Sequence, residues 1–86
     1  MTTVTLLYFA GLRERVGRSR EEVALAAGTA TVASLVQQLR SRDERYGEAF
    51  ATGANWRVAV NQRMADAGTA LASGDEVAFF PPVTGG

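Results

Sequence analysis

The C-terminal segment is the part of the sequence whose residue types and spacing indicate chemistry. Residues 81–86 read Pro-Pro-Val-Thr-Gly-Gly and follow a strand-like run. Proline fixes φ near −65° and disfavours helix in the residue before it, so the two prolines should end the strand and hold the next residues extended. Gly85 and Gly86 lack a Cβ, so they fit a channel too narrow for other residues and leave the terminal carboxylate open to attack. This tail therefore indicates insertion into another protein, and the alternative is an inert terminus.

The composition excludes most chemistry by side chains. The sequence contains no cysteine and no histidine, and all nine basic residues are arginine. The usual nucleophiles, general bases, thiolate zinc ligands and Schiff-base amines are therefore missing. Ordinary side-chain catalysis is not expected, and the sequence indicates no bound cofactor or metal.

Length and charge indicate one small domain that works with other proteins. The 86 residues suit a globular domain at 1–80 followed by an extended tail at 81–86. Nine acidic residues balance nine basic ones, which argues against nucleic acid as a partner. No apolar run approaches the roughly 20 residues that span a bilayer, so no membrane contact is expected. The start Met1-Thr2-Thr3 lacks a signal-peptide pattern, which favours the cytoplasm.

Hydrophobic periodicity predicts an α+β fold. Alternating apolar residues predict strands at Thr3–Ala10 and Glu76–Phe80. Thr31 is a plausible N-cap of a helix that runs to about Arg42, because apolar residues recur there at i, i+3, i+4 and i+7. The other expected elements are one or two helical turns at Gly11–Gly17, a strand at Glu22–Ala26, a surface loop at Asp43–Asn55 with one helical turn, a strand at Trp56–Val60, a turn at Asn61-Gln62 and a short strand at Arg63-Met64. The order is ββαβββ, which predicts four or five strands on one main helix.

One helix covers only one face of such a sheet. The side chains expected between sheet and helix are Val4, Leu6, Val77 and Phe79 from the strands and Leu35, Val36 and Leu39 from the helix. The opposite face would then carry Leu7, Phe9, Ala78 and Phe80. An uncovered apolar area of this kind is typical of a protein interface. The alternative is that Gly11–Gly17 or Asp43–Asn55 folds over that area.

Three segments together resemble a known family. They are Leu7–Glu14 (LYFAGLRE), Val58–Asn61 (VAVN) and Gly74–Gly86 (GDEVAFFPPVTGG), and they occur in family order. The chain resembles the small subunits of molybdopterin synthases. The resemblance implies the ubiquitin-like β-grasp fold, a mixed sheet over one helix. Tyr8 departs from the family, in which phenylalanine is common at this position.

The resemblance implies a sulfur carrier. A ubiquitin-activating-type enzyme would adenylate Gly86 with ATP, and sulfide from a cysteine desulfurase system would displace AMP to leave a thiocarboxylate. The tail would then donate sulfur to a cyclic pterin precursor inside the large subunit of a heterotetramer, where the dithiolene that later binds molybdenum or tungsten is built. The large subunit would supply the catalytic side chains, so the carrier itself needs no bound cofactor.

The same resemblance implies roles for particular residues. Gly86 is the adenylated and thiolated residue, and Gly85 lets the tail pass. The apolar residues implied to contact both partner enzymes are Phe9, Met64 and Phe80. Arg13 is implied as a polar contact on the same side, and Pro81 as a further partner-binding residue. Alternation independently places Phe9 and Phe80 on the open side of the sheet. Met64 rests on the resemblance alone, and its alternative is a methionine that fills a gap in the core.

Other functions remain open at the level of the sequence. A sibling carrier would use the same terminal chemistry to supply sulfur for thiamine, transfer-RNA thiolation or cysteine synthesis, or would act as a ubiquitin-like modifier joined to lysines. A β-grasp interaction module with an inert tail belongs to a different class. Deletion of Gly86 separates these classes, because only the module would keep its function.

Overall fold

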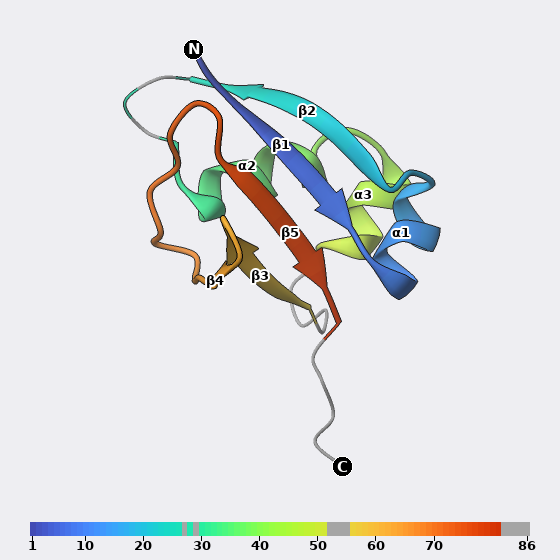
Figure 1. The fold of residues 1–86 in the computed structure, drawn as a ribbon. Helices are drawn as coiled ribbons and strands as arrows, with labels where there is room; N and C mark the ends of the chain where they lie inside the picture. The colour runs from blue at the N-terminus through green and yellow to red at the C-terminus, as the bar shows by residue number, and fades with distance from the viewer. Residues whose placement is uncertain (27, 29, 52–55, 82–86) are drawn as a thin grey trace.

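The computed structural model describes residues 1–26, 28, 30–51 and 56–81. A five-stranded sheet carries a layer of helices on one face, as Figure 1 shows. In chain order the elements are β1 (Thr2–Tyr8), α1 (Ala10–Val16), β2 (Arg20–Leu25), α2 (Val32–Arg40), α3 (Glu44–Ala49), β3 (Arg57–Val60), β4 (Arg63–Met64) and β5 (Glu76–Phe80).

The sheet is mixed, with the strand order β2-β1-β5-β3-β4. The two central strands, β1 and β5, run parallel, and the other neighbours are antiparallel. The predicted α+β class is therefore confirmed, including the pairing of the first and last strands on which the open apolar face depends. The turn at Asn61-Gln62 also forms, and both residues have positive φ, at 51° and 68°.

Helix α2 begins where the sequence predicts because Thr31 caps it. The Ser34 amide donates to Thr31 Oγ1 over 3.1 Å, and the Thr31 amide donates to Ser34 Oγ over 2.9 Å. This reciprocal capping box satisfies two backbone donors that a helix start leaves free. The helix ends at Arg40 rather than Arg42. Arg42 instead reaches β2, where its Nη1 lies 2.6 Å from Glu21 Oε1.

Two further short helices lie beside the main helix α2, at the places where the sequence predicts short helical turns. The first strand stops at Tyr8 instead of Ala10, and Gly11–Gly17 contributes to α1. The Asp43–Asn55 segment holds α3, which begins where Asp43 Oδ1 accepts a 3.1 Å hydrogen bond from the Tyr46 amide. Both helices bury apolar side chains in the same core as α2. The alternative in which these segments fold over the other face of the sheet is therefore wrong, at least for their described residues.

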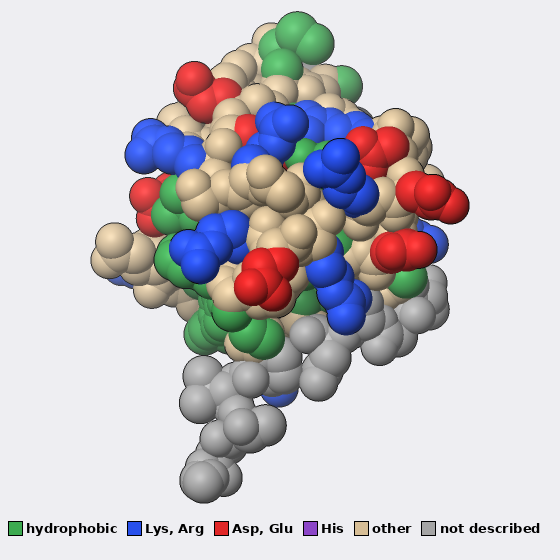
Figure 2. All heavy atoms as spheres, turned by 90° about the vertical axis from the view of Figure 1, so that its right-hand side faces the viewer, with side chains coloured by type: hydrophobic (Ala, Val, Ile, Leu, Met, Phe, Trp, Pro, Cys, Tyr) green, Lys and Arg blue, Asp and Glu red, His purple; other side chains and the backbone are tan. Residues whose placement is uncertain are grey.

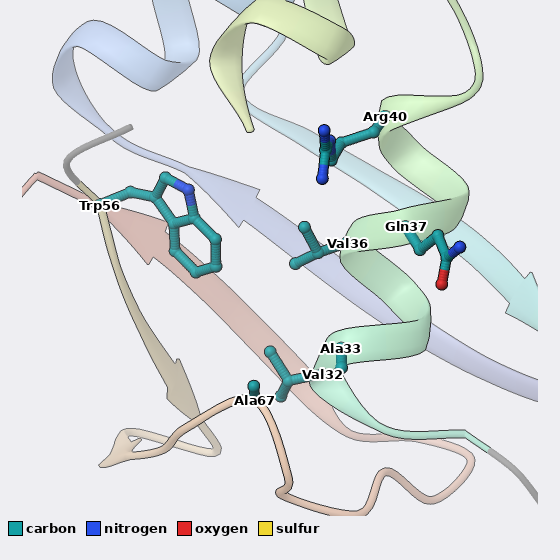
Figure 3. Close-up of a pocket in the computed structure, with 7 residues that line it drawn as sticks. All are labelled: Val32, Ala33, Val36, Gln37, Arg40, Trp56 and Ala67. Carbon is teal, nitrogen blue, oxygen red and sulfur yellow. The ribbon is translucent and has the colours of Figure 1, made fainter. Parts of the chain in front are cut away.

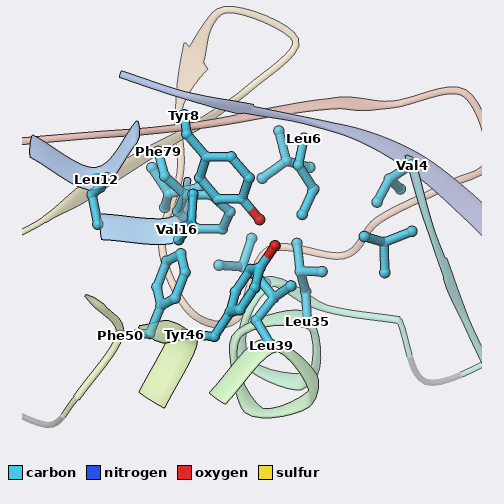
Figure 4. Close-up of a cluster of buried hydrophobic side chains, with 14 of the residues drawn as sticks. Val4, Leu6, Tyr8, Leu12, Val16, Leu35, Leu39, Tyr46, Phe50 and Phe79 are labelled. Carbon is cyan, nitrogen blue, oxygen red and sulfur yellow. The ribbon is translucent and has the colours of Figure 1, made fainter. Parts of the chain in front are cut away.

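The core between sheet and helices is largely aromatic near the ends of β1 and β5 (Figure 4). Tyr8 stacks on Phe79 with ring centroids 6.1 Å apart, and Phe50 meets Phe79 edge-on at 4.9 Å. Trp56 adds a second edge contact to Phe79 at 5.5 Å. The predicted core residues are buried, except that Val36 is only half-buried at the edge of the cluster. This packing anchors the two strands that lead to Phe9 and to the tail.

A carboxylate inside this layer ties the helices to the sheet. Glu21 on β2 has a side chain that is 7% exposed. Its Oε2 accepts 2.8 Å hydrogen bonds from both Tyr8 Oη and Tyr46 Oη, and its Oε1 accepts from Arg42. Burial raises the pKa of Glu21, but the hydrogen bonds from Arg42, Tyr46 and Tyr8 lower it more, so the pKa lies below its ordinary value. The hydroxyl by which Tyr8 departs from phenylalanine therefore has a structural partner.

Candidate docking face and tail

The sheet face that points away from the helices, here called the open face, carries a continuous apolar row. The register pairs Leu7 with Ala78, Ala78 with Ala59, and Ala59 with Met64. Directly paired residues of neighbouring strands project from the same side of a sheet. The row therefore crosses β1, β5, β3 and β4 in a straight line.

A second apolar pair lies beside this row, at the end of the sheet where the tail begins. Phe80 is the last residue of β5. The Phe9 amide donates to the Phe79 carbonyl over 3.1 Å. This hydrogen bond places Phe9 next to Phe80, where strands β1 and β5 end. Ala10 then takes a left-handed φ of 50°, so the chain turns from β1 into α1 directly after Phe9. The ends of β1 and β5 thus bring together two aromatic residues that are far apart in the sequence.

The exposure of these side chains supports an interface. Phe9 is 46% exposed and Met64 is 64% exposed, and apart from Met1 they are the exposed large hydrophobic residues of the described chain. Phe80, Leu7 and Ala78 are half-buried. The alternative that Met64 fills a gap in the core is therefore wrong. In Figure 2, hydrophobic side chains gather at the lower left, on the side of the open face, below a mixed field of basic and acidic groups.

Of the remaining predicted site residues, the structure describes Arg13 and Pro81 but not the two terminal glycines. Arg13 lies exposed on α1, and its side chain makes no hydrogen bond or ion pair with the described part of the chain. Pro81 is exposed directly after β5. Gly85 and Gly86 lie outside the described residues. The structure thus unites Phe9, Met64 and Phe80 on one face and sets the root of the tail beside them.

The structure also holds a cavity that the sequence analysis did not predict. It measures about 310 Å³ and lies between α2 and Trp56, on the helical side of the sheet (Figure 3). Its lining consists of Val32, Ala33, Val36, Gln37, Arg40, Trp56 and Ala67. Val32, Val36 and Arg40 lie at i, i+4 and i+8, so they share one face of α2. This spacing is the feature of the sequence from which a groove along the helix could have been predicted. None of the predicted site residues lines it.

Neither a metal centre nor a membrane helix is found in the described ranges. No group of three or more Asp and Glu side chains among residues 1–26, 28, 30–51 and 56–81 could hold a metal ion. Within the same residues no helix is long and apolar enough to cross a bilayer.

Comparisons with known proteins agree with this arrangement. The chain is 43% identical over 83 residues to the molybdopterin synthase sulfur carrier subunit of Escherichia coli strain K12, covering 96% of this chain and 99% of that protein. It is 41% identical over 87 residues to the protein of the same name from Mycobacterium tuberculosis, covering 100% of both. A putative molybdopterin converting factor, subunit 1, from Pyrococcus furiosus superposes with a TM-score of 0.82 at 30% identity, covering 96% of this chain and 100% of that chain.

Fold and open face together define a ubiquitin-like β-grasp protein with exposed apolar side chains at the ends of β1 and β5. The model of the ThiS family matches residues 6–86. The chain belongs to the ThiS family.

Proposed function

We propose that this protein is the sulfur carrier subunit of molybdopterin synthase. The observation that carries the proposal is its similarity to curated sulfur carrier subunits of that enzyme over nearly the whole of both chains. The match extends through the diglycine, since the family model covers residues 6–86. The open face and the root of the tail lie where a carrier needs them, side by side at one end of the sheet.

The chemistry of the carrier resides in Gly86. A carboxylate is a poor electrophile, so an adenylating enzyme first joins it to AMP, with ATP as the co-substrate and pyrophosphate as the leaving group. Sulfide then attacks the carbonyl carbon and AMP leaves, which produces a C-terminal thiocarboxylate. Its sulfur attacks a carbon of the pterin precursor and displaces an oxygen substituent from that carbon. Water then hydrolyses the acyl–sulfur bond, which leaves the sulfur on the pterin and regenerates the carboxylate of Gly86. The carrier needs no cysteine for these steps, which agrees with its composition.

The open face supports the transfer by docking. Phe9, Met64 and Phe80 supply apolar area for the large subunit of the synthase, and Gly85 lets the tail enter that subunit without a side chain. The adenylating enzyme would use the same face, so the two complexes exclude each other. A carrier bound to one partner at a time shuttles between activation and transfer. The large subunit, in a heterotetramer with the carrier, supplies the catalytic side chains.

The proposed chemistry also suggests where the protein works. Adenylation consumes ATP, which is a cytoplasmic metabolite, so we place the carrier in the cytoplasm. Its partners are the large subunit and the adenylating enzyme, and it holds no cofactor of its own.

Intact mass spectrometry tests this function. The protein is incubated with ATP, a sulfide source and a molybdopterin synthase adenylating enzyme, and its mass should increase by the replacement of one oxygen by sulfur. Fragmentation should locate the change at Gly86. The loaded carrier is then added to the large subunit and the pterin precursor, and dithiolene should form. An unchanged mass with an adenylating enzyme that loads its own carrier would contradict the proposal.

The second step separates this function from the sibling carriers. Loading at Gly86 without dithiolene formation would favour a carrier for thiamine, transfer RNA or cysteine. Covalent transfer of the chain to lysines of other proteins would favour a modifier.

A further inference from the structure

Charged side chains on the open face are arranged by sign. Arg57 on β3 is paired with Phe80, and Arg20 on β2 is paired with Leu7. Both arginines are exposed, and both project from the same side of the sheet as their apolar partners. The row and the pair described above, together called the apolar patch, consist of Leu7, Phe9, Ala59, Met64, Ala78 and Phe80. The two arginines flank this patch from two sides, in the half of the face nearest the tail.

Two carboxylates occupy the other half of the same face. Glu22 on β2 and Glu76 on β5 are both paired with Thr5, two residues before Leu7 along β1. Strands rise roughly 3.3 Å per residue, so the four residues from Glu76 to Phe80 separate the acidic level from the level of Arg57 by about 13 Å. The open face thus runs from acidic, through apolar, to basic as it approaches the tail.

These four charges have no structural role among the residues that the structure describes. Their side chains make no hydrogen bond or ion pair with other described residues. Glu21 shows the contrast, because it lies next to Glu22 in the sequence but faces the helices and holds Arg18 and Arg42 in ion pairs. Arg20, Glu22 and Arg57 are exposed and Glu76 is half-buried. With no partner among the described residues, these four charges around the apolar patch are available to another protein.

We infer that this polarity fixes the orientation in which the open face docks. The inference rests on the proposed function and specifies the partner's surface: carboxylates beside the opening that admits the tail, facing Arg20 and Arg57, and cationic groups facing Glu22 and Glu76. Apolar contact is non-directional and would allow the patch to bind in more than one orientation. Like charges brought together in a reversed complex oppose that orientation, and opposite charges speed the correct encounter. Only the correct orientation aims the tail at its channel.

Association kinetics with the purified large subunit of molybdopterin synthase test the inference. The variant R57E reverses one charge at the edge of the patch, and R40E is its matched control. Arg40 is also exposed and makes no ion pair with described residues, but it lies on α2 behind the sheet. Both variants change the net charge equally. We expect R57E to lower the association rate constant about tenfold at low ionic strength and R40E by less than about twofold, with the difference shrinking at about 0.5 M salt.

A second variant reverses the polarity without changing net charge. The double substitution R20E/E22R exchanges the two charges on β2, at positions that are both exposed. We expect it also to slow association, with an unchanged circular dichroism spectrum. Rate constants equal to wild type for this variant, together with equal effects of R57E and R40E, would overturn the inference while leaving the carrier function intact. Failure of the wild-type carrier to bind the large subunit would instead contradict the proposed function.

Discussion

At the scale of single residues, the protein separates its charges by role. Glu21 points into the helical layer, where two tyrosine hydroxyls and one guanidinium satisfy its carboxylate. Glu22, the next residue, points to the open face and has no partner in the described chain. Strand alternation accounts for the difference, because neighbouring residues project from opposite sides of a sheet. Adjacent glutamates therefore serve stability and recognition separately.

The first prediction compares these two glutamates. Replacing Glu21 by glutamine removes a buried charge and leaves Arg42 and two tyrosine hydroxyls with a weaker acceptor. We expect the free energy of unfolding to fall by about 2 kcal/mol, as is usual for hydrogen bonds to a charged group. Glu22→Gln is the matched control and should change it by less than about 0.5 kcal/mol. Urea denaturation measures both, and equal effects would show that the cluster contributes nothing specific.

The second prediction concerns pH. The pKa of Glu21 in the folded protein lies below its ordinary value of 4.5. A lowered folded-state pKa contributes stability that is fully present above the unfolded-state pKa and is lost as pH falls through the folded-state pKa. The stability advantage of wild type over Glu21→Gln should therefore be constant near neutrality and shrink on acidification below about pH 4.5. Urea midpoints of both proteins measured down to pH 3 check this, and an advantage at pH 3 as large as that at neutral pH would contradict it.

At the scale of secondary-structure elements, periodicity was most informative where one face of an element is buried. The alternation in β1 and β5 correctly predicted which residues face the core and which form the open patch. The i, i+3, i+4, i+7 stripe and the Thr31 cap likewise predicted α2. Helices α1 and α3 were predicted only as short helical turns without exact bounds, because seven and six residues carry too short a pattern. Tertiary contacts of Leu12 and Tyr46 in the shared core stabilise them.

The candidate site was predicted only in part from the sequence. The positions of Phe9 and Phe80 followed from alternation, but that of Met64 followed only from family resemblance, because two residues of β4 show no period. The bonds of Glu21 to Tyr8, Arg42 and Tyr46 join residues as many as 25 positions apart, so no local pattern could show them. The positions of the four charges on the open face could not be predicted either, because they follow from strand register, which joins segments that are distant in the sequence.

The third prediction belongs to the ends of β1 and β5. Phe80→Ala removes the half-buried ring that lies next to Phe9 on the open face. We expect the dissociation constant for the large subunit to rise about 30-fold, or about 2 kcal/mol, as for a central aromatic anchor. Val36→Ala removes a half-buried apolar side chain from the helical face and should leave binding unchanged. Isothermal titration calorimetry measures both constants, and unchanged affinity of Phe80→Ala would exclude Phe80 as an anchor.

At the scale of the whole molecule, stability, docking and chemistry occupy different parts. The helices lie on one side of the sheet (Figure 1), and the Glu21 cluster joins them to it. The apolar patch and its four charges lie on the other side. The residues proposed to react, Gly85 and Gly86, follow β5 in the sequence and lie outside the described residues. Because the core is built from residues between Val4 and Phe79, we expect that the last residue can be removed without disturbing the fold or the patch.

Deletion of Gly86 tests that separation as the fourth prediction. The variant should unfold at the same urea concentration as wild type, because residues 1–80 hold the core. It should still bind the large subunit within about threefold of the wild-type dissociation constant, since the apolar patch remains and only one residue of the tail is removed. Sulfur transfer should be abolished, because the chain would end at Gly85 and its carboxylate would stop one residue short of both active sites. Phe80→Ala should instead weaken binding and leave the chemistry intact. Its thiocarboxylate formation should recover when the concentration of the adenylating enzyme is raised. A Gly86 deletion that still supports dithiolene synthesis would place the chemistry elsewhere in the chain and contradict the carrier function.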